Sequence, residues 1–135
     1  MSARGDIENV LNRYSIAYDD NDMAEMADTF AEKAVLTMRI GGGDLIGPFE
    51  GKEAVMKLMT DSLASQTDQR RHVTTNFVLR SEDGTNAVVD SYLTLISVEN
   101  GTATLLSTAK YSDELVKEDG VWRFTKRHIE LDLPY

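Results

Sequence analysis

Three short turn sequences in the second half of the chain constrain the fold more than any other feature. Each pairs Asp or Asn with Gly, the residues that most readily adopt the positive φ angles of a two-residue hairpin turn. They are Asp83-Gly84, Asn100-Gly101 and Asp119-Gly120. They separate four β-rich runs that begin near Arg71. The sequence therefore predicts a meander of long antiparallel hairpins.

The first half of the chain has helical periodicity instead. One apolar stripe repeats at spacings of three and four residues, as on one face of an amphipathic helix. Its members are Ile7, Val10, Leu11, Tyr14 and Tyr18. The polar run 19–22 should end this helix, because short acidic and amide side chains compete for local backbone groups. Asp22 with Glu25 three residues later predicts the start of a second helix. That helix would carry Met23, Met26, Ala27 and Phe30.

The rest of the first half alternates between extended and helical segments. A strand is expected over residues 34–40, a flexible turn over 41–44 and a break at Gly47-Pro48. A third helix is expected over 51–65. Its buried side would be formed by Val55, Leu58, Met59 and Leu63. Helices followed by an antiparallel meander define the α+β class. At 135 residues the chain fits a single domain over residues 1–135.

Composition excludes several classes of function. The net charge of −9 repels phosphate backbones, and the basic pairs Arg70-Arg71 and Lys126-Arg127 are too short for a nucleic-acid-binding stripe. The absence of cysteine rules out disulfides and a thiolate nucleophile. The first residues lack the apolar run of a signal peptide, and no apolar segment approaches 18 residues. We therefore expect a cytoplasmic protein with neither a nucleic acid nor a membrane as partner.

Only two side chains titrate near neutrality without help, His72 and His128. Strand alternation places His72, Thr74 and Asn76 on one face of the predicted strand. The other face would then carry Val73, Thr75 and Phe77. A polar row of this kind is suited to the inside of a pocket. Alternatively, His72 and its neighbours form a strand end that is exposed to solvent.

Asp19 lies at the predicted end of the first helix. A carboxylate at a helix C-terminus opposes the macrodipole by about 0.3–1 kcal/mol, so Asp19 either has a functional task or is satisfied by neighbouring turn groups and water. The acidic cluster of Asp19, Asp20 and Asp22 lacks the glycine and the distal glutamate of a calcium loop. No metal is expected there.

Other residues have simple structural interpretations. Tyr14 lies on the apolar stripe, where an aromatic side chain usually belongs to the core. The Gly41-Gly42-Gly43 run lacks the lysine and the context of a phosphate loop. In the last strand, Trp122 and Phe124 should face the core. Alternation would then place Arg123, Thr125 and Arg127 on the opposite face.

Taken together, the motifs of the chain resemble the SnoaL-like family of the nuclear-transport-factor-like fold. They are Tyr14 with Asp19, the Phe30-Ala31-Glu32 segment, residues 47–52, residues 71–76, residues 111–114 and residues 119–124. The resemblance spans nearly the whole chain. It implies a cone-like α+β barrel in which a strongly bent antiparallel sheet and three helices from the N-terminal half enclose a pocket. The fold hosts many activities, so the site must decide the function.

The resemblance also implies candidate site residues. The chain is similar to bile-acid dehydratases in Tyr14, Asp19 and His72, where those enzymes have a catalytic tyrosine, aspartate and histidine. Lindane dehydrochlorinases have their aspartate and histidine at Asp19 and His72 and an arginine at Arg127. Other positions differ, because Met38, Leu95 and Tyr14 stand where relatives have a tyrosine, an aspartate and a lysine. The expected substrate contacts are Arg127, Met38, Asn76 and Tyr18.

These observations predict a cofactor-independent lyase or isomerase. An imidazole with a carboxylate on its other nitrogen can remove a proton from a substrate, and Tyr14 or Arg127 can stabilise the negative charge that develops. The expected ligand is a hydrophobic, cyclic small molecule. Two alternatives remain open: a module that binds a small ligand without transforming it, and an assembly module of the same fold. A homodimer formed through the sheet face opposite the pocket is expected.

Overall fold

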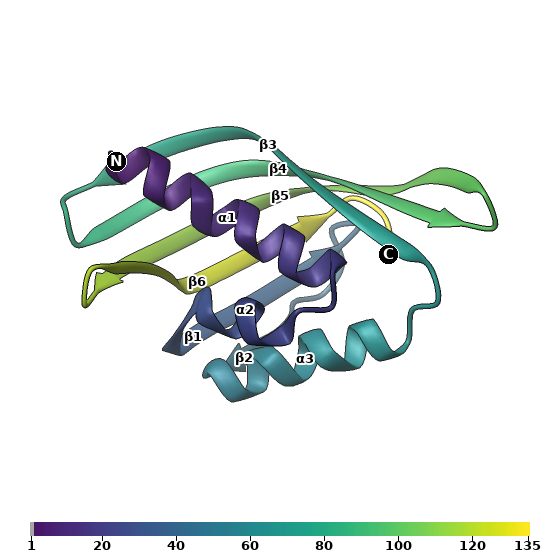
Figure 1. The fold of residues 1–135 in the computed structure, drawn as a ribbon, viewed down its shortest axis with the longest axis horizontal. Coiled ribbons are helices and arrows are strands. Elements are labelled where there is room, and N and C mark those ends of the chain that lie inside the picture. The colour runs from purple at the N-terminus through teal and green to yellow at the C-terminus, as the bar shows by residue number, and fades with distance from the viewer. Residues whose placement is uncertain (1) are drawn as a thin grey trace.

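A single six-stranded sheet is wrapped around three helices in the computed structural model, which describes residues 2–135 (Figure 1). The elements in chain order are α1 (Ala3–Asp19), α2 (Met23–Asp28), β1 (Phe30–Ile40), β2 (Ile46–Glu50), α3 (Lys52–Ala64), β3 (Gln69–Glu82), β4 (Asn86–Glu99), β5 (Thr102–Glu118) and β6 (Val121–Leu131). The strands lie in the order β2-β1-β6-β5-β4-β3. The predicted α+β class and bent sheet are confirmed.

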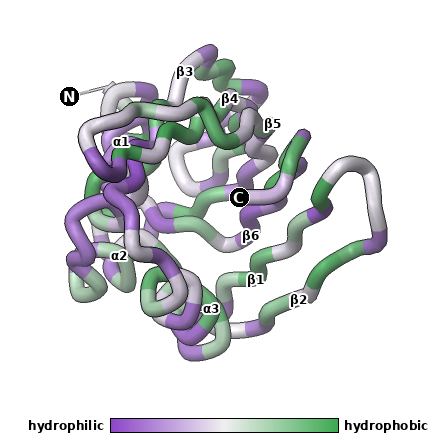
Figure 2. Tube along the Cα trace, turned by 90° about the vertical axis from the view of Figure 1, so that its right-hand side faces the viewer, coloured by the Kyte–Doolittle hydropathy of each residue, from purple (hydrophilic) through white to green (hydrophobic). Residues whose placement is uncertain are grey.

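The helices cover the concave face of the sheet. Figure 2 shows the strands curving from β3 at the top to β2 at the lower right, with α1 and α2 on the inner side. The apolar stripe predicted for α1 is buried against the sheet. Among residues 2–135, no helix combines the length and the hydropathy needed to cross a membrane.

The second helix ends earlier than the sequence predicts. Asp22 caps α2 as expected by accepting a hydrogen bond from the backbone N–H of Glu25 at 3.1 Å. Phe30, however, belongs to β1 and not to the helix. The cause lies at Thr29, whose carbonyl accepts a hydrogen bond from the backbone N–H of Phe124 in β6 at 2.8 Å. Hydrogen bonding to β6 therefore begins before another helical turn can form.

The predicted meander of four strands is confirmed, from β3 to β6. Two of its turns have the positive φ angles that the sequence indicates, 52° at both Asn100 and Asp119. The sheet is mixed, however, because β1 lies parallel to β6. The short strand β2 was not predicted from the Gly47-Pro48 break. It pairs only with β1, and a proline is tolerated on such an edge strand.

Two bulges change which side chains face the helices. In β3 the register with β4 shifts between Thr75 and Val78, and in β6 the register with β5 shifts at Thr125. Each bulge adds one residue to its strand, so the alternation of side chains reverses beyond it. The sequence gives no direct sign of either position. The reversals decide where two predicted site residues lie.

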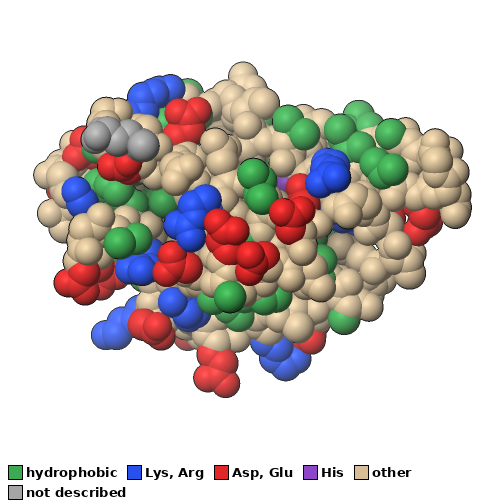
Figure 3. All heavy atoms as spheres, in the orientation of Figure 1, with side chains coloured by type: hydrophobic (Ala, Val, Ile, Leu, Met, Phe, Trp, Pro, Cys, Tyr) green, Lys and Arg blue, Asp and Glu red, His purple; other side chains and the backbone are tan. Residues whose placement is uncertain are grey.

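The convex face of the sheet carries exposed apolar side chains. They are Val73, Val78, Val88, Tyr92, Val98 and Leu105, all from β3, β4 and β5. On the helix side, acidic and basic side chains lie next to one another with apolar side chains between them (Figure 3). The exposed fractions of Tyr92 and Leu105 reach 54% and 63%. Apolar patches of this kind commonly mark protein interfaces.

The expected homodimer remains a prediction that this face makes testable. We expect the protein to sediment as twice its 15.0 kDa chain mass at micromolar concentration. Tyr92→Lys and Leu105→Lys should dissociate the dimer, because each would place a charge inside the interface. Ile16→Lys is a matched control, since Ile16 is equally exposed on the helix side, at 58%. A monomeric wild-type protein would contradict the prediction.

Candidate functional site

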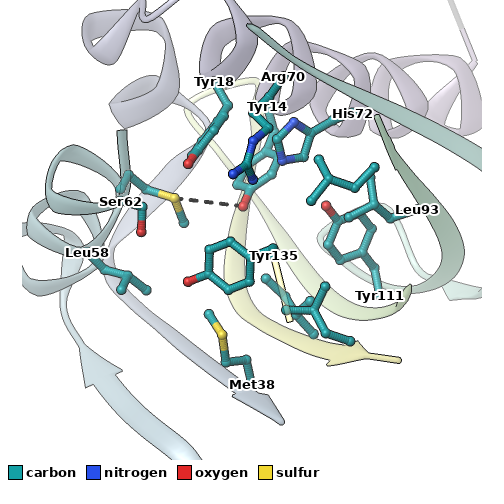
Figure 4. Close-up of a pocket in the computed structure, with 14 residues that line it drawn as sticks. Tyr14, Tyr18, Met38, Leu58, Ser62, Arg70, His72, Leu93, Tyr111 and Tyr135 are labelled. Carbon is teal, nitrogen blue, oxygen red and sulfur yellow. Dashed lines mark hydrogen bonds between the residues drawn. The ribbon is translucent and has the colours of Figure 1, made fainter. Parts of the chain in front are cut away.

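A pocket lies between the concave face of the sheet, α1 and α3 (Figure 4). Its apolar lining consists of Met38, Leu58, Met59, Leu93, Leu95, Ile129 and Leu131. Its polar lining consists of Tyr14, Tyr18, Ser62, Arg70, His72, Tyr111 and Tyr135. The cavity volume is about 50 Å³ in this conformation, with the ring of Tyr135 in the pocket. An apolar cavity with a few convergent polar groups is the usual form of a small-molecule site.

The carboxylate of Asp19 holds His72 in place with two hydrogen bonds. Oδ2 accepts from the backbone N–H of His72 at 2.8 Å, and Oδ1 is 2.6 Å from the imidazole Nδ1. Both side chains are more than nine-tenths buried. Because a carboxylate can only accept, the neutral form of this imidazole carries its hydrogen on Nδ1 and its lone pair on Nε2. The predicted hydrogen bond at the pocket is present, and its catalytic role remains a prediction.

The position of Asp19 follows from how α1 ends. Asn21 adopts a φ of 56°, and the backbone N–H groups of Asn21 and Asp22 donate to the carbonyls of Tyr18 and Ala17. These bonds form a Schellman motif, which stops the helix sharply. Asp19 therefore occupies the last helical position with its side chain towards β3. The macrodipole penalty of about 0.3–1 kcal/mol is smaller than the contribution of about 1.5–3 kcal/mol expected from each charged hydrogen bond.

Two tyrosines from α1 supply hydroxyl groups to the pocket. The Tyr14 hydroxyl points into the cavity and lies 3.8 Å from the sulfur of Met59 (Figure 4). The Tyr18 hydroxyl donates to Oε1 of Gln66 at 3.0 Å, and its ring lies against the His72 imidazole with centroids 4.6 Å apart. Burial raises the pKa of both tyrosines above the usual value. Both hydroxyls therefore remain protonated at neutral pH and can donate hydrogen bonds.

Arg127 does not lie where alternation predicts. The bulge at Thr125 turns its side chain to the same face as Phe124, and the residue is fully buried. Its guanidinium carbon lies 3.6 Å from the ring centroid of Tyr111, 4.2 Å from that of Tyr14 and 4.6 Å from that of Phe124. Arg127 therefore supports the pocket from behind the two tyrosines and is not among the lining residues. The structure does not bring it to the position of a substrate contact.

Asn76 also lies outside the pocket. It adopts a φ of 56° within the bulge of β3 and is exposed beside Thr75 and Tyr92. The expected row of His72, Thr74 and Asn76 is therefore wrong at its last member, and Phe77 takes the inward position. Met38 and Tyr18, the other two predicted contacts, do line the cavity.

Arg70 is a pocket residue that the sequence analysis missed. In the sequence it forms half of a short basic pair, and it stands two residues before His72 on the same strand. Strand alternation therefore could have placed it on the inner face. Leu93 and Leu95 on β4 form part of the apolar wall.

Within residues 2–135, no group of three or more potential His, Cys, Asp or Glu ligands is placed to hold a metal ion.

The fold and the site together define a pocket protein with an aspartate–histidine pair at the end of its first helix. A model of the SnoaL-like domain matches residues 1–128, and the chain belongs to that family. It is 28% identical over 130 residues to a gamma-hexachlorocyclohexane dehydrochlorinase from Sphingobium indicum, covering 95% of this chain and 80% of the relative. A second dehydrochlorinase from the same species is 26% identical over 128 residues, covering 93% and 79%.

Solved structures support the same fold. A protein of unknown function with a cystatin-like fold from Nostoc punctiforme superposes with a TM-score of 0.82 at 24% identity, covering 99% of this chain and 97% of that one. A candidate scytalone dehydratase from Novosphingobium aromaticivorans gives a TM-score of 0.76 at 23% identity, covering 93% and 81%. At these identities the likeness establishes the architecture alone.

The buried pair behind the pocket makes stability depend on pH. Arg127 Nε lies 3.2 Å from Asp113 Oδ1, and both side chains are fully buried. Desolvation raises the pKa of Asp113 to about 7, against the attraction of Arg127. The unfolded chain thus releases this proton at lower pH than the folded protein does. Between the two pKa values the folded state binds the additional proton, so its stability falls as the pH rises.

We expect Asp113→Asn to remove this dependence. The free energy of unfolding of the wild type, minus that of the variant, should decrease between pH 5 and pH 7 with a slope on the order of 1 kcal/mol per pH unit. Urea denaturation at intervals across that range measures both proteins. Other titrating groups contribute equally to the two chains and cancel. Parallel stability curves would show that Asp113 is ionised throughout.

Proposed function

We propose that this protein is a cofactor-independent lyase or isomerase in which His72 removes a proton from an apolar, cyclic small molecule. The observation that carries the proposal is the bond between Asp19 and His72 Nδ1, which leaves Nε2 as the acceptor at the pocket. In residues 2–135, Nε2 has no hydrogen-bond partner that would block this role. The backbone bond at 2.8 Å fixes the carboxylate as well, so the pair is held before substrate binds.

The proposed elimination is balanced in atoms and electrons. His72 Nε2 takes a proton from a carbon atom, and the electron pair of the broken C–H bond forms a new double bond. The bond from the neighbouring carbon to its leaving group breaks, and that group departs with its electrons. Asp19 stabilises the imidazolium that results. Release of the proton to solvent or to the departing group returns His72 to its initial state, so the reaction needs no cofactor.

The tyrosines provide the complementary charge stabilisation. A hydroxyl that remains protonated can donate a hydrogen bond to oxygen or halide as negative charge develops. Tyr14 fits this role because its hydroxyl points into the cavity and has only the weak acceptor sulfur of Met59 nearby, at 3.8 Å. Tyr18 is less available, since its hydroxyl donates to Gln66. Tyr14 is therefore the proposed acid or anion-stabilising group.

Relatives support an elimination over other proton transfers. Those named as hexachlorocyclohexane dehydrochlorinases remove hydrogen chloride, and the fold neighbour described as a scytalone dehydratase would remove water. A base that takes a proton next to a leaving group can start either kind of reaction. Tyr14 stands where the resemblance gives the dehydrochlorinases a lysine, and Met38 and Leu95 stand where it gives bile-acid dehydratases a tyrosine and an aspartate. We therefore propose that this chain takes a different substrate from those enzymes.

A binding module without catalysis is the alternative function. It is favoured by the largely apolar lining of the cavity. Under that proposal, a ligand would bind the wild type without conversion, and His72→Ala would retain its affinity.

Variants of the pair test the enzymatic proposal. The wild type is incubated in D2O with γ-hexachlorocyclohexane and a panel of cyclic β-hydroxy ketones, and NMR follows both elimination and exchange of the acidic C–H. His72→Ala should abolish either reaction, and Asp19→Asn should slow it by about two to four orders of magnitude, because the tautomer is no longer fixed. Tyr14→Phe should cost about ten- to a thousandfold.

His128→Ala is the matched control. His128 is the second histidine of the chain, and its ring contacts Thr37 at 2.6 Å and Glu130 at 2.7 Å outside the pocket. Its loss should leave turnover unchanged. Full activity in a folded His72→Ala protein would refute the proposed base.

A further inference from the structure

The pocket contains a permanent positive charge that the proposed proton transfer does not use. Among the described residues that line the cavity, Arg70 is the one that carries such a charge. Its side chain is 10% exposed. A guanidinium that is nine-tenths buried is rarely found without a definite set of partners, because desolvation of an unpaired charge is costly. The partners of Arg70 therefore indicate what the pocket is built to bind.

One side of this guanidinium is anchored. Arg70 Nε donates to Asp68 Oδ2 at 2.6 Å, and the same carboxylate oxygen accepts a hydrogen bond from the hydroxyl of Ser97. Burial opposes the ionisation of Asp68, but the bonds from Ser97 and Arg70 outweigh it and lower its pKa. Asp68 is thus ionised at neutral pH. It fixes the direction of the arginine by holding its inner nitrogen.

The other side of the guanidinium is available to a ligand. Nη1 and Nη2 make no hydrogen bond with any group in residues 2–135. Figure 4 shows the guanidinium directed into the pocket beside the Tyr14 hydroxyl and the His72 ring. The two outer nitrogens of a guanidinium match the two oxygens of a carboxylate. Arg127 cannot serve in this way, because it is enclosed by aromatic rings and paired with Asp113.

We infer that Arg70 binds a permanently charged oxygen group of the substrate, so the substrate class is an apolar ring compound that carries a carboxylate or an equivalent oxyanion. The inference deepens the proposed function, since it rests on the same pocket. The anion would be held at the β3 side of the cavity while the ring contacts Leu93, Leu95 and Ile129. Arg70 is then a specificity-determining residue, and it orients the substrate C–H towards His72.

Paired ligands that differ only in charge test the inference. We would titrate the protein with benzoate and 2-naphthoate and with their uncharged analogues benzamide and 2-naphthamide, following the methyl NMR signals of Leu93, Leu95 and Ile129. The carboxylates should bind at least tenfold more tightly than the amides. Arg70→Met should remove that preference, weakening carboxylate binding tenfold or more and leaving amide binding unchanged.

Arg71→Met is the matched control, because Arg71 is the neighbouring arginine and is exposed. It makes the same change of charge and should leave every affinity unaltered. Arg70→Lys keeps the charge without the fork geometry and should retain part of the preference. If urea denaturation shows that Arg70→Met does not fold, Arg70→Lys is used as the test variant instead.

Two results would overturn the inference. One is equal affinity of the wild type for the carboxylates and the amides. The other is an Arg70→Met protein that folds and binds benzoate and 2-naphthoate as tightly as the wild type. His72→Ala should still bind benzoate. A failure of the proposed catalysis is therefore distinguishable from a failure of the anion site.

Discussion

The two hydrogen bonds between Asp19 and His72 join the end of α1 to the first residues of β3, an edge strand of the sheet. Gln69 strengthens this junction, because its side-chain amide donates to the carbonyl of Asp19 at 2.8 Å. An orphan carbonyl of the helix end is thereby satisfied. The junction places α1 across the concave face and sets the tautomer of the histidine. One carboxylate thus serves the architecture and, in the proposed mechanism, the chemistry of the pocket.

Local chemistry in the sequence predicts the elements well. Turn residues such as Asn100 and Asp119 specify their own φ angles, and Asp22 caps the helix that follows it. The bulges could not be predicted, because they depend on how one strand fits its neighbour. They move Asn76 out of the pocket and turn Arg127 into the core. The parallel pairing of β1 with β6 is likewise a tertiary contact without a local signal.

The two arginines of the site have opposite environments. Arg127 is surrounded by Tyr14, Tyr111 and Phe124, and its charge is shared between their π faces and Asp113. It therefore stiffens the wall on which Tyr14, the proposed anion-stabilising residue, lies. Arg70 is restrained on one side only and keeps hydrogen-bond donors for a ligand. The family resemblance predicts Arg127 as a site residue, whereas strand alternation from His72 predicts that Arg70 faces the pocket.

The acidity of the molecule as a whole has a consequence for how quickly a negatively charged ligand arrives. With a net charge of −9, the protein repels such a ligand at long range. Arg70 is nine-tenths buried and paired with Asp68, so its attraction acts at short range. Dissolved ions screen exposed charges beyond about 8 Å at physiological ionic strength, while the enclosed guanidinium is screened far less. The proposed anion site therefore implies that added salt accelerates capture of the ligand, the reverse of its effect on proteins whose surface charge steers the ligand inwards.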